Sequence, residues 1–494
     1  MTVYRQPLLI VIALFGVLSS AWCRERAVRL SECIDMALQH NLDLASGQLE
    51  PVIARYNLAG AQSAFEPVLS ARAGRTSSTS PGGVDAETKQ LFSGTETTQD
   101  RYRDAVRGLL PTGMTYSLGA SRVRTDGTSS SGSFFNEDGF IGVEVRQPLL
   151  KNLWIDTSRL QIKLGHLNLR MSESEMLALL MQVVTNVEFA YYDLIAARDQ
   201  LNIIQQSYEL ASQLVETHRK QVAVGRMARL DEKQAQARMA ASEAALFTAR
   251  NQVTERENNL KLLITGDFAS LADTKLLPTT PLQKALVERS RDASWAKALT
   301  QRPELAQAKI VLEREHIQLR FEKNQRFPSL DLTASYGFAG RGRDIRNRDT
   351  PNYGVGIRLE IPIGNGRAKA RQRAQEVRQR QALLAYKKLE QRVMAEVVEA
   401  LNAADSISKR VAATGEARAF AEAALEAEEK KLANGKSTNF IVLQLQADLT
   451  QARLSETLAI VDYNRALASL ALREASTLER HSISLSNPNS ATDS

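Results

Sequence analysis

The five histidines are the residues that could most readily bind a metal ion or transfer protons near neutral pH. They are scattered along the chain without an HExxH pair, at His40, His166, His218, His316 and His481. The chain also lacks a CxxC pair, a phosphate-binding glycine loop and a GxSxG nucleophile turn. The sequence therefore predicts neither an enzyme nor a bound cofactor or metal ion.

The other charged residues are spread too evenly to indicate a nucleic-acid surface. Lys and Arg total 63 and Asp and Glu total 56, which gives a net charge of +7 over 494 residues. A chain of this length would ordinarily form about three domains. After the first twenty residues no apolar run reaches the roughly 18 to 20 residues that a membrane-spanning helix needs. A bundle of membrane helices is therefore excluded, while a closed β-barrel remains compatible with the composition.

The N-terminus predicts secretion. Arg5 precedes an apolar stretch from Leu8 to Leu18, and the small residues that follow suit cleavage after Ala21. Residues 1–21 are therefore expected to be a signal peptide. Lipidation of Cys23 is an open alternative, although it needs a small residue where Trp22 stands.

Four sequence landmarks occur twice, in the same order. Asn41 and Pro67 in the first half match Arg302 and Pro328 in the second at a single offset. A strand that ends in proline and a glycine turn followed by a segment rich in Gln and Ala also recur. The sequence thus predicts two tandem structural repeats, roughly residues 24–266 and 285–476.

Each repeat contains a proline-free stretch far longer than an ordinary helix. The stretches run from Thr157 to Ala223 and from Arg367 to Ala433, and each would form a helix on the order of 100 Å long. Apolar residues in the first stretch recur with the average period of about 3.5 that is typical of a coiled coil. Because a glycine turn follows each stretch, at Gly225 and Gly435, each long helix is expected to pair with an antiparallel helix after it.

Several segments alternate between apolar and hydrophilic residues, as strands with two different faces do. The hydrophilic positions of the two clearest strands are Glu144, Arg146, Arg358 and Glu360. A soluble sheet would pack its apolar face on a core, whereas a membrane barrel turns that face to lipid and lines a water-filled lumen with the other. The signal peptide and the polar loops expected at 76–99 and 125–136 favour the barrel, with these four residues facing the lumen.

The first repeat has a longer strand region than the second. The interval from Pro67 to Pro148 is more than twice the interval from Pro328 to Pro362. Its excess has the pattern of a hairpin, with strands at 103–110 and 115–124 around a short turn at 111–113. A barrel that excludes this hairpin takes four strands from each chain, and one that includes it takes six. Neither number can close alone, so several chains must share the barrel.

These features together resemble the TolC family of outer-membrane efflux proteins, over about residues 30–472. The resemblance is carried by Leu30-Ser31-Glu32-Cys33-Ile34, Gln147-Pro148-Leu149, Arg302-Pro303-Glu304-Leu305, Phe327-Pro328-Ser329-Leu330 and the turns at Gly225 and Gly435. It implies an α+β membrane protein in which long antiparallel helices form an α-helical coiled-coil barrel, joined to a transmembrane β-barrel that trimerisation completes. Twelve strands are usual in the family, and six from each chain would give eighteen.

The resemblance also implies a function. The protein would be a homotrimeric channel-tunnel in the cell outer membrane with a periplasmic extension, the passive exit duct of a tripartite efflux or type I secretion system. It would contact outer-membrane lipid and dock onto a periplasmic adaptor, the membrane fusion protein, which is coupled to an inner-membrane pump or ATPase. No nucleic acid partner is expected. The alternative is a soluble periplasmic coiled-coil scaffold.

The resemblance also implies roles for two places on the helices. The tip turns match the family's adaptor-docking site, with the residues Val224, Gly225, Arg226, Met227, Asn434, Gly435, Lys436 and Ser437. Family members often narrow the tunnel with aspartates just past each turn. Asp231 matches one of them, but Ile441 and Gln444 stand at the second-repeat positions, so this candidate aperture is expected to be less acidic. Asp231 also has a simpler interpretation, as a charge stabilised in the first turn of a helix.

The expected domain organisation follows these elements. It comprises a signal peptide (1–21), an equatorial helical segment (22–66), strands and loops (67–149) and long helices (150–266) of the first repeat, a linker and equatorial helix (267–327), strands (328–364) and long helices (365–476) of the second, and a disordered tail (477–494).

Overall fold

The structure, a computed structural model, describes residues 24–129, 132–225, 228–283, 290–341, 351–434 and 436–483. Its contacts divide the chain into two units. Unit 1 comprises residues 1–45, 181–291 and 398–494, and unit 2 comprises residues 46–180 and 292–397. Within the described residues, no helix combines the length and the apolar character needed to cross a membrane.

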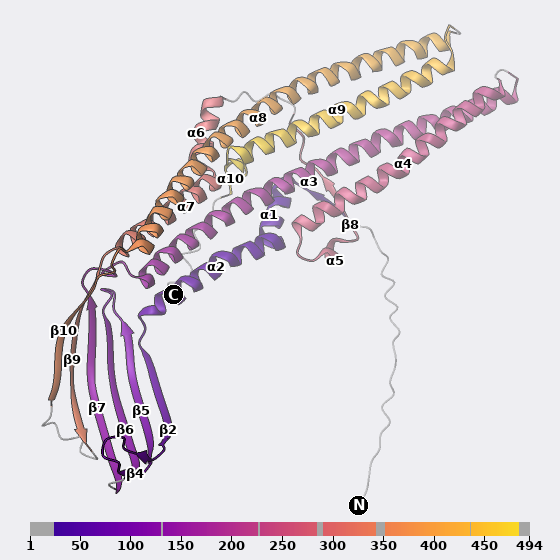
Figure 1. The fold of residues 1–494 in the computed structure, drawn as a ribbon. Coiled ribbons are helices and arrows are strands. Elements are labelled where there is room, and N and C mark those ends of the chain that lie inside the picture. The colour runs from indigo at the N-terminus through magenta and orange to yellow at the C-terminus, as the bar shows by residue number, and fades with distance from the viewer. Residues whose placement is uncertain are drawn as a thin grey trace, which may run out of the picture. The chain divides into compact units, whose positions relative to one another are not determined.

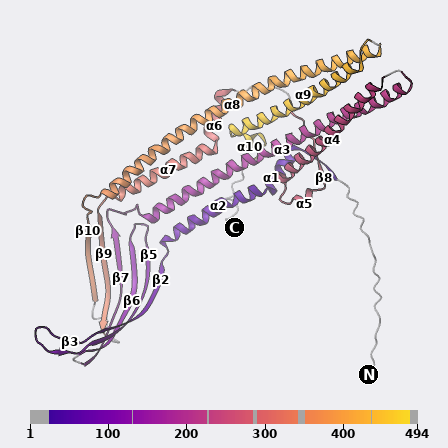
Figure 2. The same ribbon diagram turned by 45° about the vertical axis from the view of Figure 1, so that its right-hand side comes forward.

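Unit 2 contains a six-stranded sheet in which all neighbouring strands are antiparallel (Figures 1 and 2). The strand order is β10-β9-β7-β6-β5-β2. The strands are β2 (Val68–Ser80), β5 (Thr95–Leu109), β6 (Thr115–Ser129), β7 (Gly132–Pro148), β9 (Ser329–Arg341) and β10 (Pro351–Glu360), with a small hairpin of β3 (Gly83–Val84) and β4 (Leu91–Phe92) between β2 and β5. The hairpin expected in the first repeat is therefore β5 and β6, and it pairs along its length with β2 and β7.

The strands are longer than the sequence indicated, and the polar loops expected at 76–99 and 125–136 are in large part strand. β2 continues to Ser80 and β5 already begins at Thr95. Serine and threonine obscure this boundary in the sequence because their short hydroxyl side chains suit turns and strands alike. Across β2 and β5, for example, the hydroxyls of Ser77 and Thr98 lie 3.4 Å apart.

The long helices begin and end within one residue of where the sequence predicted. They are α3 (Thr157–Ala223, 67 residues) and α8 (Gly366–Ala433, 68 residues), followed by the shorter α4 (Arg229–Ile264) and α9 (Asn439–Arg473). Of the apolar positions that recur along α3, those buried in the structure include Leu180, Val183, Val187, Leu194, Ala197 and Ala211. The periodic stripe thus forms a helix-packing surface, as the coiled-coil pattern predicted.

Ion pairs join the helices of unit 1. Asp193 of α3 lies between Arg256 of α4, at 3.7 Å, and Arg465 of α9, at 3.3 Å. Burial raises the pKa of the Asp193 carboxyl, against the lowering effect of Arg465 and Arg256. Arg418 of α8 pairs with Glu456 of α9 at 2.6 Å. Each long helix therefore lies beside its shorter neighbour, as the glycine turns predicted.

Two strands of unit 1 were not predicted from the sequence. β1 pairs with β8 in parallel, and the short elements of this unit are β1 (Arg24–Val28), α1 (Leu30–His40), α5 (Phe268–Leu271), β8 (Thr274–Pro278) and α10 (Thr477–Arg480). The buried hydroxyl of Tyr191 donates to the Val28 carbonyl and accepts from the backbone N–H groups of Thr279 and Thr280, each at 3.0 Å. A single side chain of α3 thereby holds the ends of both strands.

The helices that precede the strands recur in both halves: α1 and α2 (Leu42–Gln62) before β2, with the short 3-10 turn η1 (Ser63–Phe65) between α2 and β2, and α6 (Arg291–Gln301) and α7 (Pro303–Asn324) before β9. The matched landmarks occupy the two helix junctions but are held differently. Asn41 donates to the Leu263 carbonyl at 2.9 Å and accepts from the Leu44 N–H at 3.0 Å. Arg302 is buried and pairs with Glu396 at 2.8 Å.

One expectation about the ends of the chain is wrong, and the others stay predictions. The tail expected to be disordered from residue 477 begins instead with α10, in which Thr477 and Leu478 are buried. Burial of these side chains against unit 1 explains why a polar sequence is helical there. The expected signal peptide, the possible lipidation site at Cys23 and residues 484–494 lie outside the described residues.

Candidate functional site

All four residues predicted to face a lumen lie on one face of the sheet. The register places Glu144 and Arg146 of β7 opposite Ser335 and Thr333 of β9, and Arg358 and Glu360 lie on that same face of β10, opposite Asp331 and Ser329. Arg146 also reaches the buried Asp331 carboxylate at 2.6 Å. We call this side of the sheet the polar face.

Four arginines that the sequence interpretation missed share the polar face. They are Arg72 of β2 and Arg101, Arg103 and Arg107 of β5, all exposed. The available signal was their alternation with Tyr102 and Val106, which lie on the opposite face. Asp104 breaks that pattern, because it lies on the same side as Tyr102 and Val106, opposite Ala71 and Ala120.

The opposite, apolar face carries large exposed side chains over most of its area, such as Leu118, Tyr336, Val355 and Ile357. Val355 and Ile357 are 78% and 72% exposed, respectively. Such a large exposed apolar surface indicates contact with another apolar medium or molecule.

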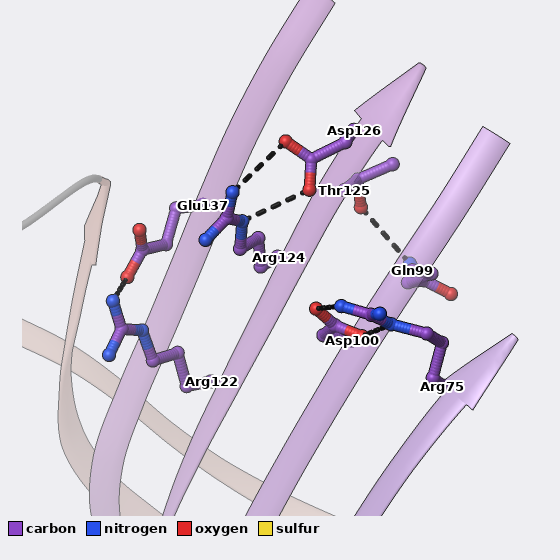
Figure 3. A network of polar contacts seen from close by, with 8 residues as sticks. All are labelled: Arg75, Gln99, Asp100, Arg122, Arg124, Thr125, Asp126 and Glu137. Carbon is purple, nitrogen blue, oxygen red and sulfur yellow. Dashed lines mark hydrogen bonds and ion pairs between the residues drawn. The ribbon is translucent and has the colours of Figure 1, made fainter.

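Apart from Asp104, charged residues on the apolar face lie toward the loop end of β2, β5, β6 and β7, and the described structure pairs most of them (Figure 3). Arg75 binds both carboxylate oxygens of Asp100, at 2.6 and 2.8 Å, and Arg124 reaches Asp126 at 3.0 Å. Arg122 pairs with Glu137. Beside them, on the polar face, Gln99 donates to Thr125 at 3.3 Å. These ion pairs neutralise the strands where the apolar surface ends.

The candidate docking tips lie at the ends of the α3–α4 and α8–α9 pairs (Figure 1). Gly225 has φ of +72° and ends α3, while Val224 is exposed. In the second tip, Ser437 donates to the Glu428 carboxylate and the Lys436 N–H reaches the Lys431 carbonyl at 2.9 Å. Hydrogen bonds from Lys431 and then Ser437 lower the pKa of Glu428. Asn434 ends α8, and Arg226, Met227 and Gly435 lie outside the described residues.

The candidate aperture residues lie in the first two turns after each tip. Asp231 is in the first turn of α4, and its backbone carbonyl lies 3.4 Å from Nδ1 of the buried His218 of α3. Ile441 is exposed in the first turn of α9, and Gln444 donates to Asp448 at 3.2 Å. Within the described residues, no hydrogen bond or ion pair joins Asp231 to the other two.

The described residues hold no cluster of His, Cys, Asp and Glu that could bind a metal ion. Cys33 is buried in α1, and burial raises the pKa of its thiol to about 12. A neutral, buried thiol is a poor nucleophile and metal ligand.

A sheet with one polar and one exposed apolar face, joined to very long paired helices, agrees with the comparisons with known proteins. The family model described as "Outer membrane efflux protein" matches residues 97–266 and 295–476, which is more than half of the chain. The chain belongs to the outer membrane efflux protein family. The family resemblance, the outer-membrane location and the absence of an enzymatic role predicted from the sequence are thereby confirmed, and the soluble periplasmic scaffold is not favoured.

Named relatives and solved structures agree with this family. The outer membrane efflux protein BepC of Brucella suis is 25% identical over 370 residues, covering 73% of this chain and 76% of BepC. The cation efflux system protein CusC of Escherichia coli K12 is 24% identical over 292 residues, covering 59% of this chain and 61% of CusC. The Campylobacter jejuni outer membrane channel CmeC has a similar fold, with a TM-score of 0.68 at 16% identity over 91% of this chain and 86% of CmeC.

Proposed function

We propose that three copies of this chain form the passive outer-membrane exit duct of a tripartite efflux or type I secretion assembly. The observation that carries the proposal is the six-stranded antiparallel sheet with one apolar face, one polar face and two edge strands. Family membership supports the efflux role, while the trimer and its partners are part of the proposal.

The edges of the sheet support closure by several chains. β2 and β10 are the end strands, so each leaves a row of backbone N–H and C=O groups without a strand partner in the described chain. Because five successive antiparallel pairings separate them, β2 and β10 run in opposite directions. The β10 edge of one copy can therefore pair antiparallel with the β2 edge of the next, and a three-fold ring of such contacts closes the barrel.

Such a ring would contain eighteen strands, the larger of the two numbers that the sequence left open. The pairing of β5 with β2 and of β6 with β7 supports the larger number, because it makes the inserted hairpin part of the sheet. The apolar face would contact outer-membrane lipid. The polar face, with Glu144, Arg146, Arg358 and Glu360, would line the lumen.

The long helices would form the periplasmic tunnel, with their tips docking on the adaptor. The tip residues are Val224, Gly225, Arg226, Met227, Asn434, Gly435, Lys436 and Ser437, and the aperture would lie just behind them, at Asp231, Ile441 and Gln444. An inner-membrane pump or ATPase would supply the energy. The recurring order of helices and strands supports two tandem repeats with the domain boundaries expected from the sequence.

Membrane fractionation and single-channel recording test the proposal. The protein is expected in the outer-membrane fraction as a trimer on gels that dissociates on heating, and the purified trimer should conduct ions in planar bilayers. A monomer in the soluble periplasmic fraction would contradict the duct and restore the scaffold alternative.

A further inference from the structure

The arginines of β2 and β5 form the most one-sided charge distribution on the sheet. Arg72, Arg101, Arg103 and Arg107 share the polar face, and the register places Arg72 directly opposite Arg103. Like charges at directly opposed positions destabilise a sheet. The pairing of Arg72 with Arg103 therefore lowers the stability of the sheet locally. Local losses of stability of this kind are typical of functional surfaces.

The neighbouring side chains provide no counter-charge. Across β6, the residues opposite Arg101, Arg103 and Arg107 are Val123, Ser121 and Ser117. Across β2, Arg101 and Arg107 face Gly74 and Val68. Among the described residues, none of the four arginine side chains has a hydrogen bond or an ion pair.

The acids of this region point elsewhere or lie farther away. Asp100 and Asp104 of β5 are on the apolar face, where Asp100 pairs with Arg75. On the polar face, Asp138 and Glu144 belong to β7, two strand spacings or roughly 10 Å from β5. Asp138 also lies 3.7 Å from Arg341. The arginines thus face water with their charge uncompensated.

We propose that the polar face of β2 and β5 is an anion-recognising section of the channel wall, which favours solutes that carry carboxylate or phosphate groups over cations. The inference rests on the proposed function, since it needs this face to line a lumen. Three copies would place three such arginine clusters around one aqueous path. A charged wall with a low-dielectric barrel behind it raises the local concentration of counter-ions and selects permeant ions by sign.

The experiment is ion selectivity of the purified trimer in planar bilayers, with potassium chloride at different concentrations on the two sides. At low salt the wild type is expected to pass chloride in preference to potassium, by roughly threefold or more. Above 1 M salt this preference should shrink, because the screening length falls to about 3 Å. Inorganic phosphate on the extracellular side should reduce the chloride current.

The deciding variant is Arg101→Gln, Arg103→Gln and Arg107→Gln combined, which keeps hydrogen-bonding capacity and removes the charge. Its chloride preference should fall to about one, and the phosphate effect should disappear. Arg124→Gln, on the apolar face, is the control and should leave ion preference unchanged. A heat-sensitive trimer band shows whether each variant assembles, and Arg103→Gln alone, with a smaller expected shift, replaces the triple variant if that fails to assemble.

The outcomes separate the two proposals. A conducting trimer whose ion preference is the same in the wild type and the arginine variant would overturn the anion-recognising wall and leave the duct intact. A wild-type protein that neither trimerises nor conducts would overturn the proposed function, and the inference with it.

Discussion

The two halves of the chain have nearly equal helices but unequal strands. α3 and α8 have 67 and 68 residues, and α4 and α9 have 36 and 35. Yet the first half contributes β2, β5, β6 and β7 to the sheet, and the second half only β9 and β10. The two helix pairs therefore match each other in length, whereas a hairpin inserted between two antiparallel strands leaves every other pairing direction intact. The sheet is therefore where this architecture tolerates growth.

The largest expected effect is on channel width, and it comes from giving the two halves of the chain the same number of strands in the sheet. Deleting residues 95–131 removes β5 and β6 and leaves β2 and β7 in opposite directions, so that they can pair directly. A trimer would then have twelve strands, and because barrel diameter grows with strand number, its cross-section should fall to about half. The size of the largest polyethylene glycol that enters from the extracellular side measures this change.

A matched deletion shows whether the effect belongs to the hairpin. Replacing residues 83–92, which contain β3 and β4, with a short Gly-Ser linker should leave the polymer limit unchanged, because neither strand pairs with the sheet. If the 95–131 deletion assembles and admits the same polymers as the wild type, the hairpin lies outside the barrel wall.

The second prediction compares the matched helix junctions. Arg302 is 5% exposed and pairs with Glu396 and Glu304, so Arg302→Ala should destabilise the protein by about 3 kcal/mol, because both contacts of the buried guanidinium are lost. Asn41→Ala removes hydrogen bonds of a neutral side chain and should cost about 1–3 kcal/mol. Thermal unfolding of the detergent-solubilised protein, followed by circular dichroism, measures both.

A double variant sharpens the comparison. Removing both charges with Arg302→Met and Glu396→Gln should recover part of the loss, since neither charge of the Arg302–Glu396 pair remains. Equal losses for Arg302→Ala and Asn41→Ala would mean that the ion pair adds nothing to what the neutral junction achieves.

The third prediction concerns glycines of the two halves. Gly225 has φ of +72° with open space around the position of a Cβ, so Gly225→Ala should cost about 1–2 kcal/mol through backbone strain alone. Gly415 lies inside α8, where an added Cβ would make only an ordinary contact, with Glu456 at 3.6 Å. Gly415→Ala should therefore stabilise by about 0.5–1 kcal/mol. The same thermal unfolding experiment measures whether each variant gains or loses stability. A loss of stability in both variants would contradict the prediction for Gly415→Ala.

The sequence predicted the helices better than the sheet, for physical reasons. The limits at Thr157, Ala223 and Ala433 are local. Asp156 caps the start of α3 by accepting a hydrogen bond from the Arg159 N–H, and a glycine follows each of the two C-terminal ends. β1 and β8 were missed because their pairing joins distant segments and leaves no periodic pattern in five residues.

The candidate sites also divide into residues that the sequence predicted and residues that it missed. Glu144, Arg146, Arg358 and Glu360 were found because strict alternation assigns them to one face, and the register places them there. The arginines of β5 were missed because Asp104 puts a charge on the apolar side and disrupts the alternation. The tips and aperture were assigned from resemblance, and their roles stay predictions.

The smallest expected effect distinguishes the two tips by pH. Hydrogen bonds lower the pKa of Glu428 below its ordinary value of 4.5, so the ionised carboxylate favours the folded tip. This contribution is present above 4.5 and is lost as pH falls through the lowered value. The α8–α9 tip should thus lose hydrogen-exchange protection in acid. Ser437→Ala should shift that loss to higher pH, because it removes one hydrogen bond to the ionised form. The α3–α4 tip, compared in the same samples, should not respond to Ser437→Ala, and equal shifts at both tips would indicate a general change in the protein instead.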